Sequence, residues 1–336
     1  MDAKTNNTRE SNAMSSYKTP LLAAMISAGL MAGAAQAEEQ LLIGSTSTSS
    51  SQYGYFVAVG QIINQEVEGV RASVVETGAT VDNLRRILRD QVDMGLVTTN
   101  VGYHAYAGEG EFADRKVDNR LLWVYSAAPQ NVVMRVDAGV TSMAELEGVE
   151  LNPGITGSAT EATTMAVMET LGISPDYVRG STTDVVAGVK DSRMAGYVKS
   201  GVGNKLDGSS LDIATFTPIE VLSLTEEQAD TLRQQMPDIS VVDIPEGAAE
   251  GIPAYTTWSF GLAMHSSPNL DEDTAYEIVK AVMENPDPQV SALANLADVD
   301  LAELTLESGT VPFHPGAARY FEEQGYEIPD HLKPVE

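Results

Sequence analysis

The chain of 336 residues contains no cysteine. Disulfide bonds, thiolate nucleophiles, Cys-ligated zinc and iron–sulfur clusters are therefore excluded, and packing alone must stabilise the fold. Histidine is scarce as well. The four His residues are scattered singly, with no His-x-x-x-His pair. Because catalytic and structural zinc sites need clustered ligands, we expect no metal site and no cofactor.

Basic residues are also few. The chain has 20 Lys and Arg against 48 Asp and Glu, a formal charge of −28, which disfavours binding to nucleic acid or to an anionic membrane surface. There is no Gly-x-Gly-x-x-Gly, no Walker A lysine motif and no Gly-x-Ser-x-Gly elbow, so dinucleotide, nucleoside triphosphate and α/β-hydrolase functions lack their usual motifs. Carboxylate pairs are too common in so acidic a chain to indicate a general acid or base.

An apolar run near the N-terminus predicts export. Lys18 precedes the run from Leu21 to Ala35, which ends in Ala35-Gln36-Ala37. A positive segment, a short apolar segment and a small-x-small cleavage site are typical of a secretory signal peptide, whereas a membrane span needs about 20 apolar residues. We therefore expect residues 1–37 to be a removed leader and the mature protein to be periplasmic. An uncleaved anchor is the alternative.

The expected mature chain begins near Glu38 and has 299 residues. The leader holds three basic and two acidic residues, so the mature chain has 17 basic and 46 acidic residues and a net charge of −29. No later apolar stretch reaches the length of a membrane span. We expect a soluble monomer, and 43% hydrophobic residues are enough to bury the cores of two lobes.

The first part of the mature chain alternates short apolar strands with amphipathic helices. Strands are expected at 41–43, 72–75 and 94–97, and helices at 53–65 and 81–90, the second with Thr80 as its N-cap. Such alternation is typical of a parallel sheet covered on both faces, so the predicted fold class is α/β.

The second part repeats this pattern. Strands are expected at 149–151 and 193–198, and a helix at 160–171. The strand at 193–198 resembles the one at 92–97, and each is followed by short polar residues, which suggests two similar lobes. A late strand at 258–264 and helices between 271 and 296 and at 317–324 would return the chain to the first lobe.

A Ser- and Thr-rich loop follows the first strand. Gly44 to Ser51 carries seven hydroxyls at the carboxyl end of that strand, which is where open α/β sheets bind ligands. Hydroxyls and free backbone N–H groups at a helix N-terminus stabilise an anion without any cation. The loop is either an anion-binding loop or a flexible polar tract. Tyr53 and Tyr55 lie beside it and are candidate ligand contacts.

A second helix start has similar features. Ser158 and Glu161 form a capping-box pattern, in which Ser158 accepts from the N–H of residue 161 and Glu161 reaches back to Ser158. That pattern is structural. The preceding Gly154 and Gly157 permit a close approach of the backbone, so the same helix start is also a candidate carboxylate site.

Lys199 and Ser200 follow a predicted strand. A Ser–Lys nucleophile pair is disfavoured because successive side chains of an extended segment point to opposite faces. Lys199 is instead a candidate counter-charge for an anionic ligand, with a solvated surface lysine as the alternative. A secreted hydrolase that uses Ser158 or Ser200 is a further hypothesis, although we expect no enzyme.

Taken together, these segments resemble the TAXI family of solute-binding proteins of tripartite ATP-independent periplasmic (TRAP) transporters. The opening Leu42-Ile43-Gly44-Ser45-Thr46-Ser47 with Tyr53-Gly54-Tyr55, the stretch from Glu76 to Arg85, and the segment from Asp93 to Tyr106 carry the resemblance. Gly157 to Glu161 and the ending from Pro312 to Ala317 also resemble family signatures. Nearly all of the mature chain is covered.

The resemblance implies a type II periplasmic-binding-protein fold with two α/β lobes and a ligand cleft between them. Lobe I would comprise residues 38–131 and 256–336, and lobe II residues 132–255. The implied function is capture of a small organic acid, a dicarboxylate such as 2-oxoglutarate or glutamate, for delivery to sodium-driven TRAP membrane subunits. A periplasmic sensor module that signals to a membrane receptor is the alternative.

The resemblance and the loop positions together give the predicted ligand-binding set. It consists of Gly44, Ser45, Thr46, Ser47, Thr48, Tyr53, Tyr55, Thr98, Thr99, Asn100, Gly157, Ser158, Ala159, Thr160, Lys199 and Ser200. The sequence departs from the family pattern at three places. Thr98-Thr99-Asn100 replaces Gln-Ser-Asp, Ala159 replaces a glycine, and Lys199 stands where an uncharged residue is usual. These changes bear on the ligand rather than on the fold.

Overall fold

The computed structural model describes residues 38–335. The predicted signal peptide at 1–37 lies outside these residues. The strands are β1 (Glu39–Gly44), β2 (Val70–Val75), β3 (Met94–Thr98), β4 (Arg120–Arg135), β5 (Glu150–Asn152), β6 (Asp176–Tyr177), β7 (Gly196–Ser200), β8 (Ile219–Leu222), β9 (Ser240–Ile244) and β10 (Tyr255–Ser266). The helices are α1 (Ser51–Glu66), α2 (Thr80–Ile87), α3 (Thr99–Ala107), α4 (Ala159–Thr170), α5 (Thr182–Lys190), α6 (Gly208–Ala214), α7 (Glu226–Gln235), α8 (Glu272–Glu284), α9 (Pro286–Ala292), α10 (Leu301–Ser308) and α11 (Pro315–Glu323).

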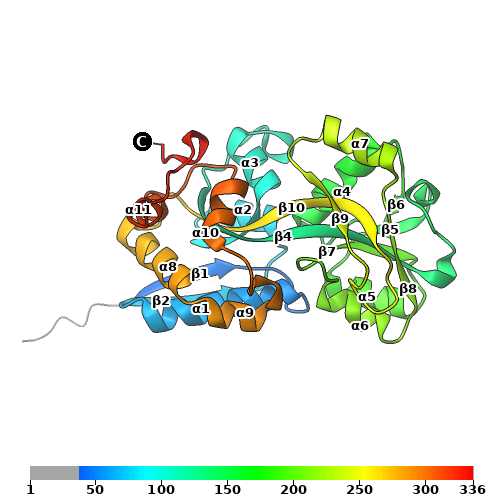
Figure 1. Cartoon of the computed structure of the whole chain (residues 1–336), viewed down its shortest axis with the longest axis horizontal. Helices are drawn as coiled ribbons and strands as arrows, with labels where there is room; N and C mark the ends of the chain where they lie inside the picture. Colours follow the sequence, from blue (N-terminus) through cyan, green and yellow to red (C-terminus); the bar gives the residue numbers. More distant parts are fainter. Residues whose placement is uncertain (1–37, 336) are drawn as a thin grey trace, which may run out of the picture. The chain divides into compact units, whose positions relative to one another are not determined.

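The strands follow the order β2-β1-β3-β10-β4-β7-β5-β6 (Figure 1). In the first lobe, β1 pairs with β2 and β3 in parallel, and β10 adds to β3 antiparallel. In the second lobe, β5 pairs with β6 and β7 in parallel, and β4 adds to β7 antiparallel. The two halves therefore have the same local order, as the repeated sequence pattern suggested.

Two long strands, β4 and β10, run through both lobes. The first part of β4 pairs with β10, from Arg120 opposite Ser266 to Pro129 opposite Ser259. The last part of β4 pairs with β7 and β8. In the same way, the first residues of β10 pair with β9 and the later ones with β3 and β4. These strands are the crossing segments that join the lobes.

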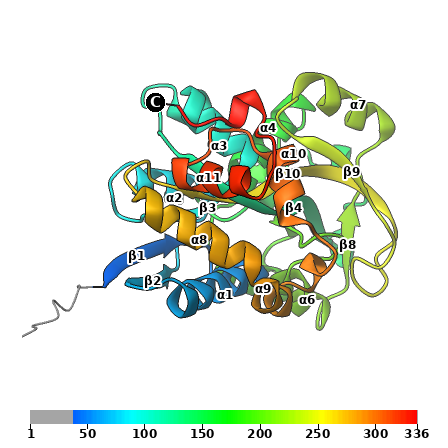
Figure 2. The ribbon, with the colours of Figure 1, turned by 60° about the vertical axis from the view of Figure 1, so that its left-hand side comes forward.

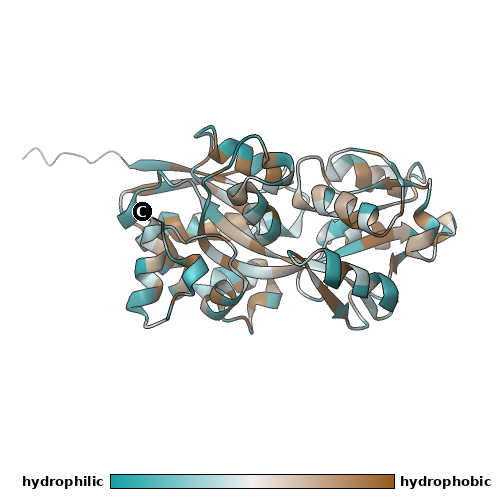
Figure 3. Ribbon diagram, turned by 90° about the horizontal axis from the view of Figure 1, so that it is seen from above, coloured by the Kyte–Doolittle hydropathy of each residue, from teal (hydrophilic) through white to brown (hydrophobic). Residues whose placement is uncertain are grey.

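Helices cover the strands, and each lobe has its own buried core. In the first lobe α1 packs on β2 and beside α8 and α9, whereas α2 packs on β3 and beside α3 (Figure 2). In the second lobe α4 packs on β7 and beside α7. Apolar residues concentrate on the strands and on the helix faces that meet them (Figure 3). This distribution follows from helical and strand periodicities that place apolar side chains inward.

The expected strands and helices of both lobes are confirmed, with three corrections. Thr80 is the first residue of α2 and not its N-cap, which is Ala79 with φ 68°. Thr98 and the pair Lys199 and Ser200 lie inside β3 and β7, whose hydrogen-bonded ladders continue beyond the apolar residues. The long strand β4 was not predicted, because Pro129, Gln130 and Asn131 interrupt its apolar pattern.

A close approach of two glycines fixes the cleft edge of the first lobe. Gly44 of β1 pairs with Gly95 of β3. A Cβ atom at Gly95 would lie 2.7 Å from the Gly44 carbonyl oxygen, so the two strands could not come together with any larger residue there. Their carboxyl ends, which carry the polar loops, are thereby held side by side.

Candidate ligand-binding site

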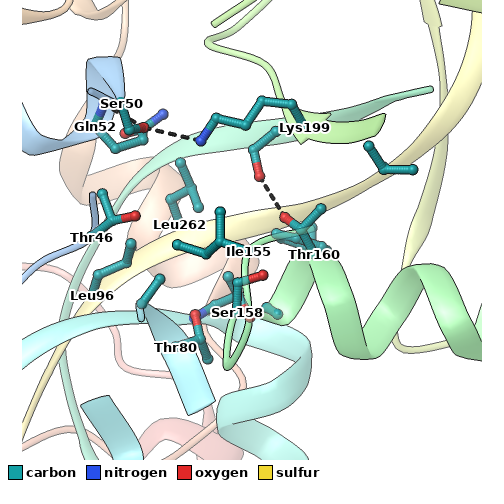
Figure 4. A pocket seen from close by; sticks show the side chains of 16 residues that line it. Thr46, Ser50, Gln52, Thr80, Leu96, Ile155, Ser158, Thr160, Lys199 and Leu262 are labelled. Carbon is teal, nitrogen blue, oxygen red and sulfur yellow. Dashed lines mark hydrogen bonds between the residues drawn. The ribbon is translucent and has the colours of Figure 1, made fainter. Parts of the chain in front are cut away.

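A small cavity lies at the carboxyl ends of the parallel strands, where the two lobes meet (Figure 4). Its volume is about 40 Å³. Open α/β sheets place ligands at this edge. The cavity is lined by Thr46, Ser50, Gln52, Ala79, Thr80, Leu96, Thr98, Ile155, Ser158, Ala159, Thr160, Val198, Lys199, Ser200, Phe260 and Leu262.

Among the lining residues, all of which belong to the described range 38–335, Lys199 is the only ionisable one. It is 8% exposed, and its Nζ donates to Ser50 Oγ at 3.2 Å and lies 3.9 Å from Asp207 Oδ1. Asp207, 1% exposed, also accepts from Ser50 Oγ, from Ser51 N, and from both N and Oγ of Ser209. Lys199 is therefore a buried cation with a partner in its own lobe and a hydrogen bond to the opposite lobe, and not a solvated surface lysine.

Gln52 supplies a donor with no acceptor. Its side chain is 3% exposed, and its Oε1 accepts from the hydroxyl of Tyr125 at 3.0 Å. Its Nε2, by contrast, has no hydrogen-bond partner among residues 38–335. An unsatisfied buried donor costs about 1–3 kcal/mol. Gln52 and Ser50 lie beside Lys199 Nζ (Figure 4), so an acceptor atom placed in this corner would satisfy Nε2 and the ammonium together.

The start of α4 supplies donors at another part of the cavity. Ser158 caps the helix by accepting from the N–H of Glu161 at 3.0 Å, as expected. Glu161 does not return the bond to Ser158, because its Oε2 accepts from Gly157 N at 2.8 Å. The backbone N–H groups of Ala159 and Thr160 belong to the first turn, which has no partners within the helix. The positive end of the helix dipole therefore faces the cavity.

Ser200 is bound into a hydroxyl network and not to a base. Its Oγ lies 2.9 Å from Thr160 Oγ1 and receives a hydrogen bond from Gln130 Nε2 at 3.2 Å. Thr160 Oγ1 in turn donates to Gln130 Oε1 at 2.8 Å. Lys199 points instead to Ser50. The arrangement offers donors to a ligand, and it does not resemble a Ser–Lys nucleophile pair, which needs direct hydrogen-bond contact.

The structure brings together part of the predicted binding set. The members that line the cavity are Thr46, Thr98, Ser158, Ala159, Thr160, Lys199 and Ser200. The members that do not line it are Gly44, Ser45, Ser47, Thr48, Tyr53, Tyr55, Thr99, Asn100 and Gly157. Most of the second group act within the protein. Thr48 N, for example, donates to Glu76, and Asn100 Nδ2 donates to Thr163 of the other lobe.

Tyr55 lies in the core of the first lobe, away from the cavity. Its ring is fully buried and stacks on Tyr125 with centroids 4.0 Å apart. Its hydroxyl accepts from Trp123 Nε1 at 2.8 Å and donates to Gln289 Oε1 at 3.2 Å. Burial raises the pKa of Tyr55 well above its usual value. Its position fits a packing role better than the predicted ligand contact.

Sequence reasoning missed several lining residues. They are Ser50, Gln52, Ala79, Thr80, Leu96, Ile155, Val198, Phe260 and Leu262. Ser50 and Gln52 could have been predicted from the sequence. Ser50 caps α1, and Gln52 lies in the first turn of that helix, where side chains face a ligand at a strand end. The apolar lining residues could not have been predicted in this way, because in the sequence they resemble any other core residue.

A second contact between the lobes involves His104 of α3. Its Nε2 lies 3.0 Å from Asp238 Oδ2, and its Nδ1 lies 3.0 Å from Glu109 Oε2. The hydrogen bond to Asp238 raises the pKa of His104, with Glu109 adding to the effect against partial burial. The same bond lowers the pKa of Asp238. Protonated His104 is therefore a link between the first lobe and the second.

This link predicts a pH dependence of stability. Because the folded pKa of His104 is raised, its contribution is fully present below the unfolded pKa of about 6.5 and is lost as the pH rises through the folded pKa. The His104 side chain is 34% exposed, so we expect less than about 1 kcal/mol. Unfolding free energies of wild type and His104→Gln, measured from pH 5 to 9, should differ at low pH and converge at high pH. A constant difference would contradict the link.

Among residues 38–335, no group of three or more His, Asp or Glu residues is arranged to hold a metal ion. None of the helices in the described range is both long and apolar enough to span a bilayer.

The fold and the enclosed cavity define the class: the chain has the two-lobe α/β architecture of periplasmic solute-binding proteins. The periplasmic binding protein BugD is similar, with a TM-score of 0.50, 12% identity, and coverage of 87% of this chain and 99% of that one. The predicted fold class is thereby confirmed. The ligand-binding component of an ABC-type import system from Staphylococcus aureus, with zinc bound, gives a TM-score of 0.49 at 10% identity over 88% and 96% of the two chains. The alkanesulfonate-binding protein SsuA from Xanthomonas axonopodis pv. citri, bound to MOPS, gives 0.46 at 13% identity over 88% and 87%.

A match in sequence shows the family to which the chain belongs. The model of the NMT1-like family matches residues 43–325, which is most of the chain. The chain belongs to the NMT1-like family.

Proposed function

We propose that this protein is a periplasmic receptor that captures a small organic anion between its lobes and delivers it to TRAP membrane subunits as a TAXI-type solute-binding protein. The observation that carries the proposal is the donor-rich lining of the interlobe cavity, with one buried ammonium and the unpartnered Nε2 of Gln52. A carboxylate supplies the acceptors that these donors lack.

We further propose the lobe boundaries and the source of affinity. Residues 38–131 and 256–336 form lobe I and residues 132–255 form lobe II, so that the lobes move apart on the crossing strands β4 and β10. A chain with a net charge of −28 repels anions at long range. Capture therefore depends on short-range donors inside a cavity with little water, where electrostatic interactions are stronger. Affinity should survive an increase in ionic strength.

The test is a thermal-shift screen of the purified protein against small organic acids, together with mass spectrometry of any molecule that copurifies. A ligand at 100 times its Kd stabilises the folded state by about 2.7 kcal/mol. That corresponds to a rise in melting temperature of roughly 4 °C for a chain of this size. The resemblance implies 2-oxoglutarate and glutamate, which belong in the screen with shorter acids. A flat response to every acid would overturn the proposal.

Transport is then tested against sensing. Co-expression with a polytopic membrane protein encoded beside this reading frame should give sodium-dependent uptake of the identified acid. Binding without any such uptake would favour the sensor alternative.

A further inference from the structure

The charge balance of the cavity limits the kind of acid that it can hold. Lys199 supplies the one positive charge of the lining, and Asp207 lies 3.9 Å behind it with a fully buried side chain. Asp207 accepts four hydrogen bonds besides, from Ser50, Ser51 and Ser209. The formal charge of the pair is therefore zero before any ligand enters.

The remaining positive potential is partial and not ionic. It comes from the first turn of α4, which is equivalent to about half a charge, from the Nε2 of Gln52 and from the hydroxyl of Ser158. These groups are enough to hold one carboxylate. A second carboxylate in the same enclosed space would meet no unpaired cation and would be repelled by the first and by Asp207.

The volume of the cavity also favours a small ligand with one carboxylate. A water molecule needs about 10–15 Å³ of such space, so 40 Å³ holds about three. Apolar side chains, among them Ile155 and Leu262, lie between the Lys199 corner and the start of α4 (Figure 4). The chemistry that fits is a short acid with one carboxylate, a few carbon atoms and a neutral polar group at its other end.

We infer that the cavity selects ligands of one net negative charge, and that Asp207 sets this limit by balancing Lys199. The inference rests on the proposed function, because it concerns the same site. It separates short monocarboxylates, which carry one charge, from dicarboxylates such as 2-oxoglutarate, which carry two. Asp207 does not line the cavity, so it is a positioning and charge-setting residue that acts through Lys199 and Ser50.

The experiment compares acids that match in shape and differ in charge. Oxalate and oxamate, malonate and malonamate, and succinate and succinamate are titrated calorimetrically into the mature protein. In each pair an amide replaces a carboxylate and removes one negative charge. Wild-type protein should bind at least one amide acid, and it should bind it at least about tenfold more tightly than the matching dianion, because the second carboxylate has no counter-ion.

Asp207→Asn raises the charge of the site by one. We expect the preference to shift by at least about tenfold toward the dianion. Asp212→Asn is the matched control. Asp207 is the N-cap of α6, and Asp212 lies within the same helix, where the same change affects an exposed residue that pairs with Lys190. In Asp212→Asn the ratio of the affinities for the amide acid and the matching dianion should equal that of wild type. Circular dichroism and a melting curve check that Asp207→Asn is folded.

Should Asp207→Asn fail to fold, Lys199→Met provides the opposite change, because it leaves Asp207 unbalanced. The discrimination against dianions should then grow beyond that of wild type. Failure of all six acids to bind wild-type protein would overturn this inference, whereas the proposed function fails only with a flat response to every acid of the broader screen. Dianions that bind wild type as tightly as their amide partners would overturn the charge limit alone and leave the proposed function standing. If folded Asp207→Asn keeps the wild-type ratio of affinities for the amide acid and the matching dianion, Asp207 does not set the charge limit.

Discussion

Replacing Lys199 with Met should raise the Kd for oxamate by about 10- to 150-fold. The ammonium is buried beside the cavity and is its one ionic group. A hydrogen bond to a charged group is worth about 1.5–3 kcal/mol, and every 1.4 kcal/mol is a factor of ten in Kd. The affinity of the variant for oxamide, the neutral analogue, should fall much less. Calorimetric titration of both compounds measures the two effects.

The variant should remain folded, because Asp207 keeps the four hydrogen bonds that it accepts from Ser50, Ser51 and Ser209. Lys190→Met is a suitable control. It removes the same charge from an ion pair of the second lobe, in which Lys190 is half-buried and its partner Asp212 is exposed. Its affinity for oxamate should equal that of wild type. Equal losses for oxamate and oxamide in Lys199→Met would show that the lysine is not a counter-charge.

The fold was predictable because strand and helix periodicities are local properties of the sequence. The parallel strands β1 and β3 contain short apolar runs, and the helices α1 and α4 begin with the capping residues Ser50 and Ser158. The crossing strand β4 was not predictable, because the sequence in its middle is typical of a loop. The side chains of Gln130 and Asn131 bond to distant residues, Ser200 and Tyr255, which no local pattern reveals.

The candidate site was predictable in part for a related reason. Ser158, Thr160 and Lys199 follow from the rule that polar residues at the ends of parallel strands gather at one sheet edge. The rule says nothing about which side of a helix faces that edge. Residues two apart on a helix are separated by about 200°, so Tyr53 and Tyr55 cannot both face a ligand. In the structure Gln52 faces the cavity, whereas Tyr55 turns into the core.

A single methyl group at Gly78 should weaken ligand binding more than it destabilises either lobe. Gly78 lies in the loop before α2, and a Cβ atom there would lie 2.8 Å from the carbonyl oxygen of Thr156 in the opposite lobe and 3.2 Å from Asp82 Cβ in its own lobe. The neighbouring N–H groups of Val81 and Asp82 donate to the Gly157 carbonyl, so this region is a direct contact between the lobes. The closer contact is the one across the lobes, so Gly78→Ala acts mainly against the closed arrangement.

Overpacking of this kind costs about 1–3 kcal/mol, so the Kd for the ligand should rise by about five- to 150-fold. The melting temperature of the ligand-free protein should stay near that of wild type, because the clash disappears when the lobes separate. Gly54→Ala is the matched control, since a Cβ atom at Gly54 in α1 meets nothing within 4 Å. Small-angle scattering should show wild type contracting on addition of ligand and Gly78→Ala contracting less. If Gly78→Ala binds and contracts as wild type does, the loop contact does not control closure, and the cavity must admit its ligand by another route.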